Sequence, residues 1–195
     1  WVRIPELKIG TTITAKWGNP NALTQPDYCL NGSIWNRYHA VWHMEGDDPT
    51  VIRESRGSLH GTATNFVENP RVPGVIGKAL SFDGVNDYVN LPIEAHPPGD
   101  AKQLTISFWT YGGLSLPKNT SILESGSSLG RHLNIHHPWS NGRIYWDAGS
   151  GSVDRIEKND FNYRGEWVHW TFQKESSIGA MYIYKNGEEW MSGYS

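Results

Sequence analysis

The sequence predicts an all-β fold, built as a two-sheet antiparallel β-sandwich or jelly roll, and three observations support this. Aromatic residues are abundant, with 10 Trp, 9 Tyr and 5 Phe in 195 residues, and 21 Gly and 11 Pro supply turns. Short segments alternate apolar and polar side chains, which is typical of strands that have one face in a core. No long segment shows the apolar spacing of an amphipathic helix.

The predicted strands follow one another along the chain and are separated by turn residues. Asn141-Gly142 and Asn186-Gly187 stand where a two-residue hairpin turn needs positive φ. We expect residues 1–34 to be a strand pair and linker, the tail of a preceding module, and residues 35–195 to be one domain. The alternating segments are 1–7, 11–17, 39–45, 78–84, 87–92, 104–111, 120–125, 131–137, 142–149, 166–175 and 180–190.

Charge and composition exclude several classes of partner. The net charge of -3 comes from interspersed acids and bases, so no basic stripe indicates nucleic acid. The apolar runs are too short for direct membrane insertion. Cys29 is the single cysteine, which excludes an internal disulfide. Because the chain starts without Met or a leader pattern, we expect neighbouring domains of a longer chain.

Residues 131–151 hold the candidate ligand site. With a two-residue turn at Asn141-Gly142, His137 pairs with Trp146 and His136 pairs with Asp147. One face of this hairpin is then apolar and includes Trp139 and Trp146, while a one-residue slip would exchange the two faces. The other face, called the polar face below, carries His132, Asn134, His136, Tyr145 and Asp147, with Arg143 beside the turn.

Two interpretations of the polar face are open. Hydrogen-bonding groups around one aromatic ring suit a sugar or another polar ligand. Alternatively, the face is an ordinary solvated sheet surface, in which His136 and Asp147 form a cross-strand pair worth about 0.2–1 kcal/mol. His132 and His136 are about 13 Å apart on an extended strand, which is too far for one shared metal ion.

Four segments carry a resemblance to a known family: "AVWHMEGD", "SRGSLHGTA", "GVIGKALSFDGVNDYVNLP" and "LTISFWTYGG". In their order and spacing they resemble the LamG-like jelly-roll branch of the concanavalin A-like lectin/glucanase superfamily, over roughly residues 39–193. Because domains of this family continue through further strands, the resemblance implies that the domain of residues 35–195 is truncated at its C-terminus. Residues 1–22 look like the end of a small bacterial β domain of unknown function.

The resemblance implies a function as well as a fold. It implies a non-catalytic module of a larger exported or surface protein, extracellular or in the cell envelope, that binds a glycan or another ligand. The alternative is a structural or adhesive module that contacts a surface protein in an assembly. The family pattern also implies that Trp109 is buried between the sheets.

Calcium binding and catalysis are weighed on separate residues. Asp83, Asn86 and Asp87 place three oxygen donors at one turn, which suits a structural Ca²⁺. The alternative is that Asp83 serves only the backbone of its turn and Asp87 is a solvated strand start. Glucanases of this superfamily use paired carboxylates on one strand face. Their usual signature resembles Glu-x-Asp-x-Glu, whereas the nearest run here, residues 45–49, lacks the third acid and ends in Pro. We therefore expect no enzymatic activity. A polysaccharide-acting enzyme is the remaining alternative.

Overall fold

The structure is a computed structural model that describes residues 4, 6, 8–14, 18, 20–21, 31–98, 101–127, 130–149 and 154–194. Contacts divide the chain into two compact units, Trp1–Ala95 and His96–Ser195. Apart from two short 3-10 helices, all regular elements in these residues are strands, which confirms the all-β prediction. In this part of the chain, no helix is long and apolar enough to cross a membrane.

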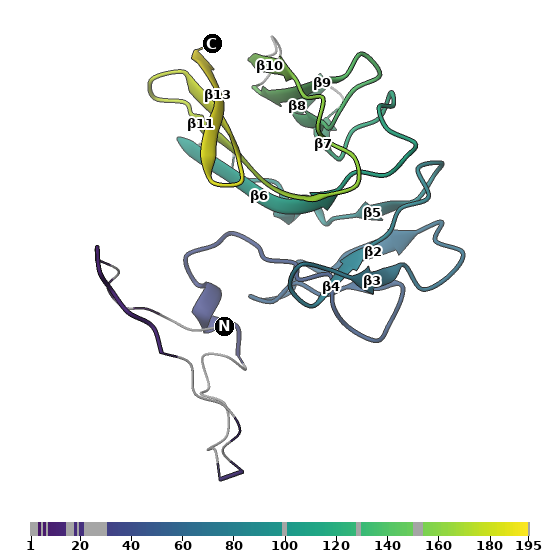
Figure 1. Cartoon of the computed structure of the whole chain (residues 1–195), viewed down its shortest axis with the longest axis vertical. Helices are drawn as coiled ribbons and strands as arrows, with labels where there is room; N and C mark the ends of the chain where they lie inside the picture. Colours follow the sequence, from purple (N-terminus) through teal and green to yellow (C-terminus); the bar gives the residue numbers. More distant parts are fainter. Residues whose placement is uncertain are drawn as a thin grey trace. The chain divides into compact units, whose positions relative to one another are not determined.

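The first unit contains short strands in two small antiparallel sheets, one of order β1-β2-β5 and one of β3-β4 (Figure 1). The predicted strand at 39–45 is reduced to an isolated bridge between Trp42 and Glu54. The predicted strand pair in residues 1–34 lies largely outside the described residues. The elements are η1 (Ser33–Trp35), β1 (Val51–Ile52), β2 (Gly61–Thr64), β3 (Arg71–Pro73), β4 (Lys78–Leu80), β5 (Tyr88–Asn90) and η2 (Ile93–Ala95).

A buried carboxylate organises the loops of this unit. Glu54 is 5% exposed and accepts hydrogen bonds from the backbone N–H groups of Val41 (2.9 Å), Arg56 (2.8 Å) and Gly57 (2.6 Å). Burial alone would raise the pKa of Glu54, but the three N–H donors outweigh burial and hold the pKa below its ordinary value. The stability from these bonds is therefore present above the ordinary pKa of a glutamate and is lost as pH falls through the depressed pKa.

Glu54→Gln is expected to lower the free energy of unfolding of the chain by about 2 kcal/mol. The amide replaces one acceptor oxygen by a donor that faces backbone N–H groups, and a hydrogen bond to a charged group contributes about 1.5–3 kcal/mol. Urea denaturation at neutral pH measures the change. Glu68→Gln, at an exposed carboxylate of the same unit, is the control and should change nothing; equal stability of both variants would contradict the role of Glu54.

The second unit consists of two four-stranded antiparallel sheets, of order β10-β9-β8-β7 and β13-β12-β11-β6 (Figure 1). The first sheet and strands β11 to β13 are meanders, in which neighbours in sequence are neighbours in the sheet. The jelly-roll connectivity stays a prediction. The strands are β6 (Gln103–Tyr111), β7 (Leu123–Ser127), β8 (Gly130–His136), β9 (Arg143–Ala148), β10 (Arg155–Asn159), β11 (Trp167–Glu175), β12 (Ala180–Lys185) and β13 (Glu188–Tyr194).

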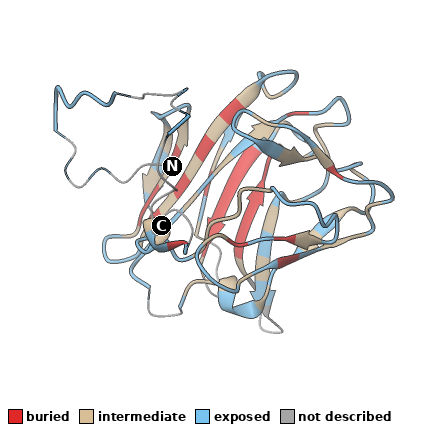
Figure 2. Cartoon of the chain, turned by 90° about the horizontal axis from the view of Figure 1, so that it is seen from below, coloured by how far each residue is buried: buried red, intermediate tan, exposed pale blue. Residues whose placement is uncertain are grey.

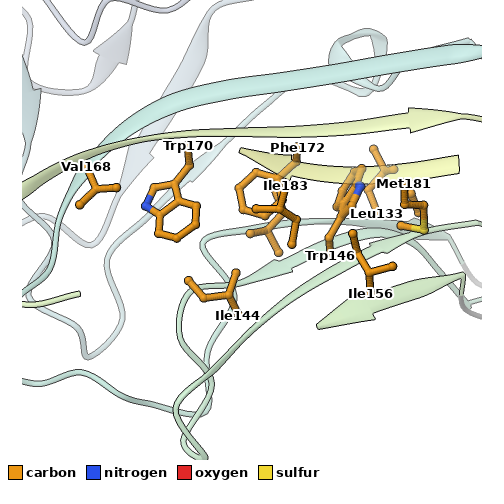
Figure 3. Close-up of a cluster of buried hydrophobic side chains, with 11 residues drawn as sticks. Leu133, Ile144, Trp146, Ile156, Val168, Trp170, Phe172, Met181 and Ile183 are labelled. Atoms are coloured by element: carbon orange, nitrogen blue, oxygen red, sulfur yellow. The ribbon is translucent and has the colours of Figure 1, made fainter. Parts of the chain in front are cut away.

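The two sheets pack through their apolar faces into a β-sandwich. Trp146 from β9 lies against Phe172 from β11, with ring centroids 5.8 Å apart. The indole nitrogen of Trp146 donates to the Gln173 carbonyl (3.0 Å), so this polar group is satisfied in the core. The buried cluster also contains Leu133, Ile135, Ile144, Ile156, Val168, Trp170, Met181 and Ile183 (Figure 3).

Strand alternation decides which side chains enter this core. In β11 the buried positions are every second residue, among them Val168, Trp170 and Phe172, and the residues between them are only partly buried (Figure 2). The alternation in the sequence at 166–172 predicts this core face and an outer face with Trp167, His169 and Thr171, and the burial pattern confirms it. At Asn186-Gly187, Lys185 pairs with Glu188 and both turn residues have positive φ, as the two-residue hairpin requires.

The register of the β8–β9 hairpin differs from the prediction by two residues. His136 pairs with Tyr145, and not with Asp147. Residues 137–142 form a longer loop, in which Pro138 has no N–H to donate to a ladder and only Gly142 of the Asn-Gly pair has positive φ. Because the displacement is an even number of residues, the apolar and polar faces keep the predicted members within β8 and β9.

Candidate functional site

The structure brings four of the predicted ligand residues together on the polar face of β8 and β9. Their exposed fractions are 0% for Asn134, 5% for His136, 8% for Tyr145 and 1% for Asp147. His132 is half-buried, and its ring lies 6.0 Å from that of His96. The interpretation of the polar face as an ordinary solvated surface is therefore wrong for Asn134, His136, Tyr145 and Asp147, because each of them is buried.

An ion pair from the neighbouring strand β10 covers part of this polar face. Arg155 donates two hydrogen bonds to the carboxylate of Asp147, at 2.6 and 2.7 Å. Hydrogen bonding to Asp147 is the main reason that the pKa of Arg155 lies above its ordinary value. The guanidinium of Arg155 also lies 4.7 Å from the ring centroid of Tyr145, a cation–π contact. Asp147 and Tyr145 thus serve an internal network.

His136 is held by a loop residue and by an aromatic ring. Its Nδ1 lies 3.1 Å from the carbonyl oxygen of Thr120, within hydrogen-bond distance. The ring of Trp139 lies 4.3 Å from the ring of His136. Trp139 was predicted to join the core, but β8 ends at His136, so the alternation does not extend to it and its half-buried ring packs on the polar side.

A different surface of the sandwich exposes its aromatic side chains. Trp109 is 45% exposed, so the expectation that it is buried between the sheets is wrong, and Phe108 packs against the core in its place. The reason is the parity of β6, in which Leu104, Ile106 and Phe108 occupy the inward positions. The outward aromatic residues of β6, β11 and β12 define the aromatic face: Trp109, Tyr111, Trp167, His169, Tyr182 and Tyr184.

The rings of the aromatic face meet in pairs across and along the strands. Trp109 lies 5.1 Å from His169. Tyr111 is 54% exposed and lies 5.6 Å from Trp167, with centroid distances in both pairs typical of favourable ring contacts. The alternation at 166–172 predicted the β11 part of this face correctly. Trp109 on β6 was predicted to point into the core, but it points outward.

The predicted calcium residues lie in the turn before β5. Oδ1 of Asp83 accepts hydrogen bonds from the backbone N–H groups of Val85 (2.7 Å), Asn86 (3.3 Å) and Asp87 (3.4 Å). Oδ2 of Asp87 in turn accepts from the N–H of Asp83 (2.9 Å). Among the described residues, no group of three or more His, Cys, Asp and Glu side chains is placed to hold a metal ion. Calcium binding at this turn stays a prediction.

The acidic run at residues 45–49 borders a cleft of about 490 Å³ in the first unit. Glu45 and Asp47 line it together with Arg71 and Lys78. Gly77 lies beside the Glu45 carboxylate and has a φ of +64°, in the left-handed region that favours glycine. The two carboxylates of this cleft thus share it with two cationic side chains.

Comparisons with known proteins give one structural likeness. No family model matches the chain, and no curated protein matches it. The crystal structure of residues 221–444 of an S-layer domain-containing protein from Clostridium thermocellum ATCC 27405 is similar to this chain, with 23% sequence identity and a TM-score of 0.50. The match covers 79% of this chain and 71% of that chain. The likeness extends to the fold and agrees with the all-β architecture described above.

Proposed function

We propose that this chain is a non-catalytic module of a larger exported or surface protein and that it binds carbohydrate through the aromatic face. The observation that carries the proposal is the row of outward rings on β6, β11 and β12. The C–H face of a sugar packs on an aromatic ring, while neighbouring hydroxyls and amides hydrogen-bond its hydroxyl groups. Thr105, Ser107, Thr171 and Gln173 supply such groups on the same face.

The composition of the face suits a sugar ligand. In the sheet formed by β6, β11, β12 and β13, no outward position is Leu, Ile, Val or Met. Its two carboxylates, Glu175 and Glu189, lie on different strands, so they do not form the pair on one strand that we expect of a glucanase. The likeness to an S-layer domain-containing protein supports a place at the cell surface. A lectin-like jelly roll and a structural Ca²⁺ remain parts of the proposal.

Trp109→Ala is expected to weaken binding to a neutral polysaccharide at least tenfold, because exposed Trp side chains are common hot spots of binding surfaces and Trp109 is 45% exposed. Affinity electrophoresis in gels that contain β-glucan, xylan or galactomannan measures the retardation of the purified chain. Phe161→Ala is the matched control, since Phe161 is an 83% exposed aromatic residue outside the aromatic face. Retardation that is unchanged in Trp109→Ala would overturn the assignment of the face. A chain that no polysaccharide retards, and that self-associates in size-exclusion chromatography, would favour the structural or adhesive alternative.

A further inference from the structure

The aromatic face forms a diagonal track and not a single cluster. At one end, Tyr111 on β6 pairs with Trp167 on β11. The next outward pair is Trp109 with His169. Tyr184 and Tyr182 continue the track on β12, with rings 6.2 Å apart and nearly parallel. The rings therefore shift from β6 to β12 as they proceed along the sheet.

The length of this track follows from the strand register. Tyr182 pairs with Gln173, which is six residues from Trp167 on β11. At a rise of about 3.4 Å per residue, the track extends for about 20 Å along the strands. A disaccharide covers only part of this distance, whereas an extended oligosaccharide can contact rings at both ends.

Neutral polar groups fill the gap between the two ends of the track. Ser107 pairs with Thr171, which pairs with Tyr184 on the other side. The hydroxyl of Ser107 lies 2.8 Å from Nε2 of His169, a hydrogen bond that fixes this ring beside Trp109. The track thus has hydroxyl groups beside its rings, so a sugar that packs on a ring can also form hydrogen bonds.

Charge on the face indicates an uncharged ligand. No Lys or Arg occupies an outward position on β6, β11, β12 or β13. The formal charges at outward positions are the carboxylates of Glu175, at the end of β11, and Glu189, on the edge strand β13. An acidic polysaccharide would find no cation with which to pair and would be repelled by these carboxylates.

We infer that the ligand is an extended, uncharged polysaccharide that lies along this track and is recognised over several sugar units. This inference rests on the proposed function and adds the class and length of the ligand. It requires that the end of the track at Tyr182 contributes only when the ligand is long enough to reach it.

The test uses the neutral polysaccharide that retards the wild-type chain most strongly in affinity electrophoresis. Its oligosaccharides of increasing length, from disaccharide to hexasaccharide, are titrated by calorimetry, and carboxymethylcellulose and polygalacturonate are the acidic comparison in the gels. We expect at least tenfold tighter binding of the hexasaccharide than of the disaccharide. Tyr182→Ala should weaken the hexasaccharide about tenfold and leave the disaccharide unchanged, whereas Trp109→Ala should weaken both.

The outcomes separate the two proposals. Equal affinity for disaccharide and hexasaccharide, equal loss of both in Tyr182→Ala, or stronger retardation by the acidic polymers would overturn the inference while sugar binding itself stands. A chain that no polysaccharide retards would overturn the proposed function. Tyr182→Phe keeps the ring and should bind like the wild type. Unchanged disaccharide binding by Tyr182→Ala shows that this variant is folded.

Discussion

Arg155→Ala is expected to lower the free energy of unfolding by about 3–5 kcal/mol, because it removes the counter-charge of a buried carboxylate. The side chain of Asp147 is 2% exposed, so water cannot replace the two hydrogen bonds from Arg155. Substitution of the partner, Asp147→Asn, should lower the free energy of unfolding by less, because the side chain of Arg155 is 38% exposed and its guanidinium can reach water. The difference between the two variants shows how much of the loss comes from leaving the Asp147 carboxylate buried without a counter-charge and how much comes from losing the ion pair itself.

Urea denaturation of the two variants measures this difference. Arg143→Ala is the control on the same sheet face, where Arg143 and Glu157 form an ion pair whose side chains are 44% and 32% exposed. Such an exposed pair contributes about 0–1 kcal/mol. If Arg155→Ala and Arg143→Ala cost the same, the buried network around Asp147 does not stabilise the sandwich. Arg155→Lys, which keeps the charge, provides a milder variant for comparison.

Lowering the pH from 7 to 4.5 is expected to remove about 2–3 kcal/mol of stability through His137 alone. Its ring is 7% exposed, lies 4.7 Å from the ring of Trp170, and has Asp160 and Lys185 as its charged neighbours. Burial lowers the pKa of His137 to about 4. Between this value and the ordinary 6.5, the unfolded chain binds a proton that the folded chain does not, so stability falls as pH falls through this range.

The measurement compares the wild type with His137→Phe, whose ring stays uncharged at every pH. Free energies of unfolding from urea denaturation are taken between pH 7 and pH 4.5. The wild type should lose about 2–3 kcal/mol more than the variant over this range, even if the two differ at pH 7. Parallel pH profiles for the two proteins would show that folding does not lower the pKa of His137.

The fold was predictable because the period of the apolar pattern is local information. The alternation at 166–172 placed Trp170 and Phe172 in the core correctly, and Asn186-Gly187 gave the β12–β13 turn. The strands β1, β2, β3 and β10 were missed, since two to five residues are too few to display a period. The strand predicted at 39–45 is mostly irregular, since tertiary contacts such as the Glu54 network override its alternation.

The candidate site was only partly predictable, because burial of a polar face depends on neighbours that are distant in sequence. Alternation grouped His136, Tyr145 and Asp147 correctly, but nothing near them indicated that Arg155 would cover Asp147. Trp109 was misplaced because either parity of β6 puts an aromatic ring inside the sandwich. The choice between Phe108 and Trp109 depends on which of them meets Phe172, and the stacked pair is Phe108 with Phe172.

The most direct test of the proposed binding surface is a titration followed through the tryptophan indole N–H resonances in NMR spectra. The titrant is the neutral polysaccharide that retards the chain most strongly, as its hexasaccharide. The resonances of Trp109 and Trp167 on the aromatic face should shift, and those of the buried Trp146 and Trp170 should stay in place. Unchanged Trp109 and Trp167 resonances, with a shift at Trp139 beside His136, would contradict the aromatic face and return the ligand to the polar face.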